Sequence, residues 1–167
     1  FAERISAIRS VICSAEKDEP IWGLALHDDL NTYASIFALW MEGKAYVPLH
    51  PSWPEDRIES IKEQVGCSNV LDACDAAFVE MDLDNWVETS DDALAYILFT
   101  SGSTGVPKGV QISRRNIASF MDSFWQTGID ITPDDRCMQV FDLTFDVSVQ
   151  SYLVALTRGA CVYTVPY

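Results

Sequence analysis

Basic residues are scarce in this sequence. Its 167 residues include 11 lysines and arginines against 25 aspartates and glutamates, which gives a formal net charge of −14. Such a surface repels phosphate backbones, so nucleic-acid binding is not expected. It would equally repel a nucleotide, unless local positive groups overcome the field. A lysine inside a glycine-rich segment is therefore more informative here than it would be in a basic protein.

Paired cysteines and long apolar runs are also missing. The five cysteines are an odd number and no two have C-x-x-C spacing, so neither a disulfide framework nor a zinc site is expected. No signal peptide is recognisable and no apolar run has bilayer-spanning length, so we expect no membrane insertion and a cytoplasmic protein. Residues 1–8 look like the middle of a helix, and residues 160–165 like a strand that stops at the chain end. We therefore expect a fragment of a longer protein.

Helix and strand patterns alternate along the chain. This alternation predicts an α/β fold with a mixed, largely parallel sheet flanked by helices. Strands are expected within residues 21–26, 45–49, 69–71, 94–99, 109–112, 137–141 and 160–165. Helices are expected at 1–14, from a cap at Asn31 or Thr32 to Gly43, from a capping box at Ser52 and Glu55 to Gly66, from Ser113 to Gly128, and over 149–156.

The chain divides into two α/β portions. We expect residues 1–75 to form the first and residues 93–167 the second, within one partial domain. Residues 76–92 are acidic and uneven, and we interpret them as a solvated surface connection rather than a metal site.

A polar loop follows the apolar strand at 94–99. Four hydroxyl residues, three glycines and one lysine lie within ten positions: Thr100, Ser101, Ser103 and Thr104, then Gly102, Gly105 and Gly109, and Lys108. Glycine lets the backbone approach a ligand closely, and consecutive N–H groups can converge on an anion. Hydroxyls donate further hydrogen bonds, and an ammonium adds a charge-assisted one. The pattern predicts a phosphate-binding loop.

Two alternatives explain this loop less well. A flexible linker would rarely follow an apolar strand directly and re-enter another strand at residues 109–112. A P-loop NTPase needs Ser or Thr after its lysine, whereas Gly109 follows Lys108 and Pro107 removes a backbone donor before it.

The sequence resembles the adenylate-forming superfamily, which includes acyl-CoA synthetases, luciferases and the adenylation domains of nonribosomal peptide synthetases. Residues 94–109 are similar to its phosphate-loop signature. Residues 43–51, with Pro54, Arg57 and Ile58, resemble an early motif of amino-acid adenylation domains, which usually have Asp in place of His50. Residues 109–113, with Asn116, Ser119 and Phe120, are similar to ligases that load D-alanine onto a carrier protein.

Residues 145–148 resemble a motif in which an aspartate pairs with the substrate's α-ammonium group. Physically, a buried ammonium without a counter-charge costs several kcal/mol. An ordinary helix N-cap is the alternative for Asp146, because Asp is favoured there. Together with the other two motifs, the resemblance favours a substrate-binding role.

The resemblance implies a two-step reaction that uses ATP and Mg²⁺. An amino-acid carboxylate forms an aminoacyl-adenylate, and the phosphopantetheine thiol of a carrier protein then takes the acyl group. Hydroxyls would hold phosphate oxygens at Thr100, Ser101, Ser103 and Thr104, Gly102 and Gly105 would allow close approach, and Lys108 would neutralise the β/γ-phosphates or hold the loop. Thr100 and Lys108 are the predicted catalytic residues, and no metal ligand is predicted in this chain.

The resemblance also implies that part of the enzyme lies outside this chain, and two alternative functions stand beside it. The adenine- and ribose-binding parts and a C-terminal lysine are expected beyond Tyr167, so the isolated chain should have little turnover. The alternatives are an acyl- or aryl-acid CoA ligase of the same superfamily, and a non-catalytic module that kept the fold.

Overall fold

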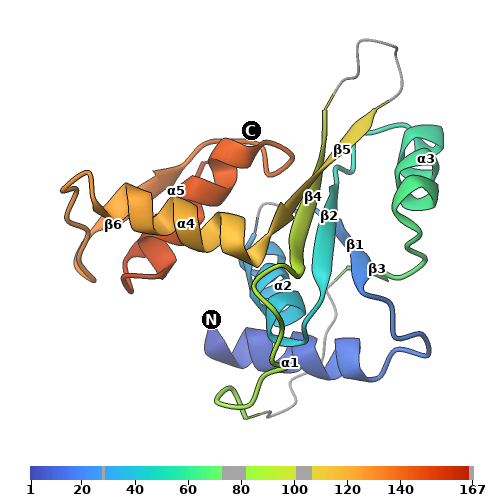
Figure 1. Ribbon diagram of the computed structural model, residues 1–167, viewed down its shortest axis with the longest axis horizontal. Coiled ribbons are helices and arrows are strands. Elements are labelled where there is room, and N and C mark those ends of the chain that lie inside the picture. Colours follow the sequence, from blue (N-terminus) through green and yellow to red (C-terminus); the bar gives the residue numbers. More distant parts are fainter. Residues whose placement is uncertain (28, 73–81, 101–106, 166–167) are drawn as a thin grey trace.

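The computed structural model describes residues 1–27, 29–72, 82–100 and 107–165. A five-stranded sheet has the order β3-β1-β2-β4-β5 and forms the centre of the molecule (Figure 1). Its strands are β1 (Ile21–Ala25), β2 (Ala45–Leu49), β3 (Val70–Leu71), β4 (Leu94–Thr100) and β5 (Lys108–Ser113). The first four are parallel and β5 is antiparallel to β4. The predicted mixed, largely parallel sheet is confirmed, and strands from both predicted portions share it.

Helices cover both faces of this sheet. Helices α1 (Ala2–Cys13), α2 (Leu30–Met41) and α5 (Asp146–Leu156) contribute to one core, and α3 (Glu55–Val65) contributes to the other. Strand β4 serves both, because successive side chains of a strand point to opposite faces. Tyr96 and Leu98 belong to the first core, and Ile97 and Phe99 to the second.

A smaller unit of two parallel strands lies beside the main sheet. Helix α4 (Arg114–Trp125) leads to β6 (Arg136–Gln139), and α5 then connects β6 to β7 (Cys161–Thr164). Helices α4 and α5 lie side by side (Figure 1), and residues of both line one cavity. Helix α5 packs into the first core through Val149, Tyr152 and Leu153.

Of the three N-caps predicted for α2, α3 and α4, one is confirmed and two are wrong. Ser113 caps α4 as predicted, and its hydroxyl accepts a hydrogen bond from Asn116 N–H. The predicted cap of α2 is wrong, because Asp29 accepts from the Thr32 N–H at 2.9 Å. The predicted capping box of α3 is also wrong: Pro54 is the N-cap, without a side-chain cap bond, and the Ser52 hydroxyl lies 2.7 Å from His50 Nδ1.

Within the ranges described, no helix combines the length and apolar character that crossing a bilayer requires.

Candidate active site

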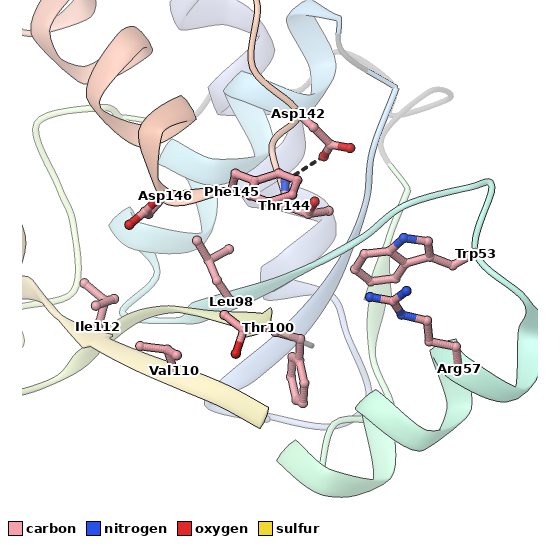
Figure 2. Close-up of a pocket in the computed structure, with 11 residues that line it drawn as sticks. Trp53, Arg57, Leu98, Thr100, Val110, Ile112, Asp142, Thr144, Phe145 and Asp146 are labelled. Atoms are coloured by element: carbon pink, nitrogen blue, oxygen red, sulfur yellow. Dashed lines mark hydrogen bonds between the residues drawn. The ribbon is translucent and has the colours of Figure 1, made fainter. Parts of the chain in front are cut away.

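A cavity of about 440 Å³ lies where the carboxyl ends of β2 and β4 meet the segment before α5. Ligands in open α/β sheets commonly bind at this edge. Figure 2 shows the residues that line it. They come from α3 and the turn before it, from the antiparallel strands β4 and β5, and from the segment that leads into the first residue of α5. These residues are Trp53, Arg57, Leu98, Phe99, Thr100, Val110, Ile112, Asp142, Thr144, Phe145 and Asp146.

A second cavity, of about 320 Å³, lies between α4 and α5. It shares Ile112 and Asp146 with the first cavity, and Tyr96 also lines it. Leu98 and Thr100 line the first cavity and follow Tyr96 at every second position of β4, so all three point to the same face. One face of β4 therefore connects the two cavities, with Asp146 between them.

Asp146 is the first residue of α5, and Phe145 is the N-cap without a side-chain cap bond. The N-cap alternative for Asp146 is therefore wrong. Its carboxylate is exposed toward both cavities and stands at a helix N-terminus, where a negative charge is favoured. Burial and the nearby Asp146 carboxylate raise the pKa of Tyr96 to about 12, so the Tyr96 hydroxyl keeps its proton at neutral pH.

The ends of the predicted phosphate loop lie together. Thr100 and Lys108 are partners in the antiparallel pair, and the Thr100 hydroxyl donates to the Lys108 carbonyl at 3.5 Å. Thr100 is exposed and lines the first cavity, whereas Lys108 is exposed and does not line it. Five predicted phosphate-loop residues lie outside the described residues: Ser101, Gly102, Ser103, Thr104 and Gly105.

His50 links the loop after β2 to Asp142, which lines the first cavity. Its Nε2 lies 3.8 Å from Asp142 Oδ2, and its Nδ1 accepts a backbone hydrogen bond from Ser52 N–H at 3.1 Å. The loop after β2 is thereby held near the segment that leads into α5.

Several cavity residues were not predicted from the sequence. Arg57 was noticed only as part of the early motif, and Trp53, Asp142 and Thr144 carried no functional signal. Spatial proximity alone brings these residues to the end of β4. Among the residues the structure describes, no three His, Cys, Asp or Glu side chains are grouped so that they could hold a metal ion.

Residues 14–167 match the model of a family described as AMP-binding enzyme. The chain belongs to this family. Its relatives are adenylation domains of nonribosomal peptide synthetases, which confirms the resemblance to the adenylate-forming superfamily.

Two relatives of this AMP-binding enzyme chain are large peptide synthetases. It is 36% identical over 151 residues to ferrichrome siderophore peptide synthetase of Mycosarcoma maydis, a match that covers 80% of this chain and 4% of that protein. It is also 36% identical over 141 residues to bacitracin synthase 1 of Bacillus licheniformis, covering 78% of this chain and 2% of the synthetase. The chain thus spans a small part of these relatives.

Solved structures show the same fold. The N-terminal subdomain of Klebsiella oxytoca NpsA, in complex with 3-hydroxyanthranilyl-AMSN, superposes with a TM-score of 0.77 at 27% identity, covering 99% of this chain and 45% of that one. The nonribosomal peptide synthetase FmoA3, in its α-methyl-L-serine-AMP bound form, superposes with a TM-score of 0.82 at 22% identity, covering 99% of this chain and 20% of that one. The predicted fold class, part of an N-terminal subdomain, is confirmed.

Proposed function

We propose that this chain is the part of an adenylation domain that holds the phosphates of ATP and the amino group of an amino acid. The observation that carries the proposal is the shared cavity wall, where Thr100 at one end of the phosphate loop and Asp146 at the start of α5 line the same space. A carboxylate and a phosphate-binding segment in one cavity suit a substrate with an ammonium group at one end and a reacting carboxylate near the nucleotide.

The reaction consistent with this arrangement is transfer of AMP to a carboxylate. A substrate carboxylate oxygen bonds to the α-phosphorus, the bond from that phosphorus to the bridging oxygen breaks, and pyrophosphate leaves. Such a transfer depends chiefly on alignment and charge stabilisation. Thr100 would donate a hydrogen bond to a phosphate oxygen, and Asp146 would orient the ammonium group. Lys108, with residues 101–105, would complete the phosphate loop.

Further roles rest on relatives and on the family resemblance. Mg²⁺ would accompany the phosphates and help to neutralise their charge. A phosphopantetheinylated carrier protein would accept the acyl group, as in peptide synthetases, and further parts of the enzyme would supply the adenine, ribose and C-terminal lysine contacts. D-alanine stays the proposed subclass of substrate, and a cytoplasmic location stays a prediction.

An aryl acid is the second candidate substrate. The structure of the NpsA subdomain carries a 3-hydroxyanthranilyl group in one complex and a 3-hydroxybenzoyl group in another. Asp146 favours an amino acid, because a substrate without an ammonium group leaves this carboxylate without a counter-charge in the bound complex.

The test is ATP–pyrophosphate exchange by the complete gene product, with each of the common amino acids, D-alanine, aryl acids and fatty acids supplied in turn. We expect exchange that depends on one or a few amino acids. Exchange that depends only on aryl or fatty acids would replace the amino-acid proposal by its alternative. Absence of exchange with every acid, together with no ATP binding by calorimetry, would indicate a non-catalytic module.

A further inference from the structure

Arg57 contributes the cationic group of the first cavity. It lies in the first turn of α3, and its guanidinium carbon is 4.0 Å from the centroid of the Trp53 ring. Both side chains line the cavity, and Figure 2 shows the guanidinium against the face of the indole. A planar cation stacked on an aromatic face loses little further freedom when it binds a ligand.

Among the described residues, the Arg57 guanidinium has no carboxylate partner. Its Nε is buried without a hydrogen-bond partner, and no carboxylate of the described residues lies within 4 Å of its nitrogens. The buried Arg9 offers a contrast: it pairs with Glu42 at 2.6 Å and donates to the carbonyls of Asp82 and Asn85. Because unsatisfied buried polar atoms are costly, the arrangement around Arg57 suits a group that arrives from outside.

The position of Arg57 indicates which group that is. In Figure 2, Arg57 and Trp53 lie at one end of the cavity, Asp146 lies at the other, and Thr100 lies between them. If Asp146 holds the ammonium group, the carboxylate and the α-phosphate come next, and the terminal phosphates lie farthest from Asp146. We propose that Arg57 binds the pyrophosphate portion of ATP, an inference that rests on the proposed function.

The charges around the cavity favour this contact. Asp142 and Asp146 are the carboxylates that line it, in a chain whose formal net charge is −14. A triphosphate would be repelled from two carboxylates unless a cation offset them. Arginine suits this role because its fork of N–H donors can bind two phosphate oxygens at once.

The experiment compares wild type, Arg57→Gln and Arg57→Lys in the complete gene product by pyrophosphate exchange. We expect Arg57→Gln to raise the KM for ATP and for pyrophosphate by about 10-fold or more, the value of one charge-assisted hydrogen bond. The KM for the amino acid should change less than about twofold, since Asp146 is untouched. Arg57→Lys should raise the KM for ATP and for pyrophosphate less than Arg57→Gln does, because lysine keeps the positive charge but lacks the fork of N–H donors. Arg115→Gln, at an exposed ion pair with Asp92, is the matched control and should match wild type.

A binding measurement separates this inference from the proposed function. Inorganic pyrophosphate should raise the thermal unfolding midpoint of wild type and of Arg115→Gln, and should do so much less for Arg57→Gln. Midpoints without pyrophosphate report any purely structural effect of the substitution. Equal pyrophosphate shifts in wild type and Arg57→Gln, or unchanged KM values for ATP and pyrophosphate, would overturn the role of Arg57. A pyrophosphate shift that needs Arg57 in a protein without amino-acid-dependent exchange would support the anion site and reject the amino-acid function.

Discussion

The hydroxyl oxygens of Tyr46 and Tyr152 lie 3.2 Å apart in the buried core and connect β2 to α5. The Tyr152 ring also packs edge-on against Tyr33 of α2, at a centroid distance of 5.6 Å. Because α5 begins at Asp146, these contacts hold the proposed amino-group site against the sheet that carries Thr100. The core and the candidate site are therefore coupled through one helix.

Removing either hydroxyl of this pair should destabilise the fold. Tyr152→Phe leaves the Tyr46 hydroxyl buried without its partner, at a cost of about 1–3 kcal/mol. The double variant Tyr46→Phe/Tyr152→Phe should cost less than the sum of the two single changes, since neither position then holds an unsatisfied group. Urea unfolding measures all three, with the exposed Tyr163→Phe as control. Strict additivity of the single effects would show that the two hydroxyls do not interact.

The same pair should make the fold sensitive to alkali. Burial raises the pKa values of Tyr46 and Tyr152 above their ordinary value of 10.0. The folded chain therefore keeps both protons while the unfolded chain loses them, so this stability is fully present below about pH 10 and is lost as the pH rises above it. We expect the unfolding free energy to fall between about pH 10 and 11.

The Tyr46→Phe/Tyr152→Phe variant tests this origin. Burial also raises the pKa of the Cys67 thiol, which adds a decline beginning near its ordinary value of 9.0. The double variant should keep the declines caused by the Cys67 thiol and by Tyr96 and lose the part caused by Tyr46 and Tyr152, giving a shallower slope above pH 10. An unfolding free energy with the same slope in both proteins would contradict the role of the tyrosines.

Substitution of Asp146 should act on the amino acid and not on the nucleotide. Asp146→Asn keeps the shape of the side chain and removes its charge, so we expect the amino-acid KM to rise by about 10-fold or more. The KM for ATP should stay within about twofold. Pyrophosphate exchange by the complete gene product provides both values, and Asp122→Asn on the exposed face of α4 is the matched control. An unchanged amino-acid KM would reject the ammonium pairing.

Loss of the loop lysine should weaken use of ATP. Lys108→Ala would remove the charge-assisted hydrogen bond that we propose Lys108 donates to phosphate, so we expect kcat/KM for ATP to fall by about 10- to 100-fold. Thr100→Ala should lower kcat/KM for ATP by a smaller factor, because a neutral donor forms a weaker hydrogen bond to phosphate. Lys62→Ala, on α3 and paired with Glu59, serves as the surface control. Normal exchange in the Thr100→Ala/Lys108→Ala double variant would remove the phosphate role.

The N-cap of α4 should stabilise one wall of the second cavity. The Ser113 side chain accepts from the Asn116 N–H at 3.2 Å, and Asn116 Oδ1 accepts from the Ser113 N–H at 2.9 Å. Ser113→Ala should lower the unfolding free energy by about 1 kcal/mol. Ser119→Ala, exposed on the same helix, should change it by less than about 0.5 kcal/mol. Thermal unfolding measures both, and equal effects would mean that the cap contributes nothing.

Local sequence signals predicted most helices and strands, because periodicity and caps act within a few residues. The continuous apolar run at 94–99 indicated a strand buried on both faces. Gly66 ends α3 in the left-handed conformation that glycine favours, with φ of 69°. The cap of α2 was misplaced because Asp29, Asn31 and Thr32 compete at that end and only backbone geometry chooses among them. The cap of α3 was misplaced because the Ser52 hydroxyl contacts His50 instead of the helix.

The element types, the acidic surface, the phosphate-loop composition and the family motifs can be inferred from the chain alone, because each depends on residues close together in it. That Arg57, Thr100 and Asp146 line one cavity emerges only from the folded arrangement. Residues 57, 100 and 146 come from a helix, a strand end and a second helix start, and they meet because parallel strands and their crossovers end at one edge of the sheet.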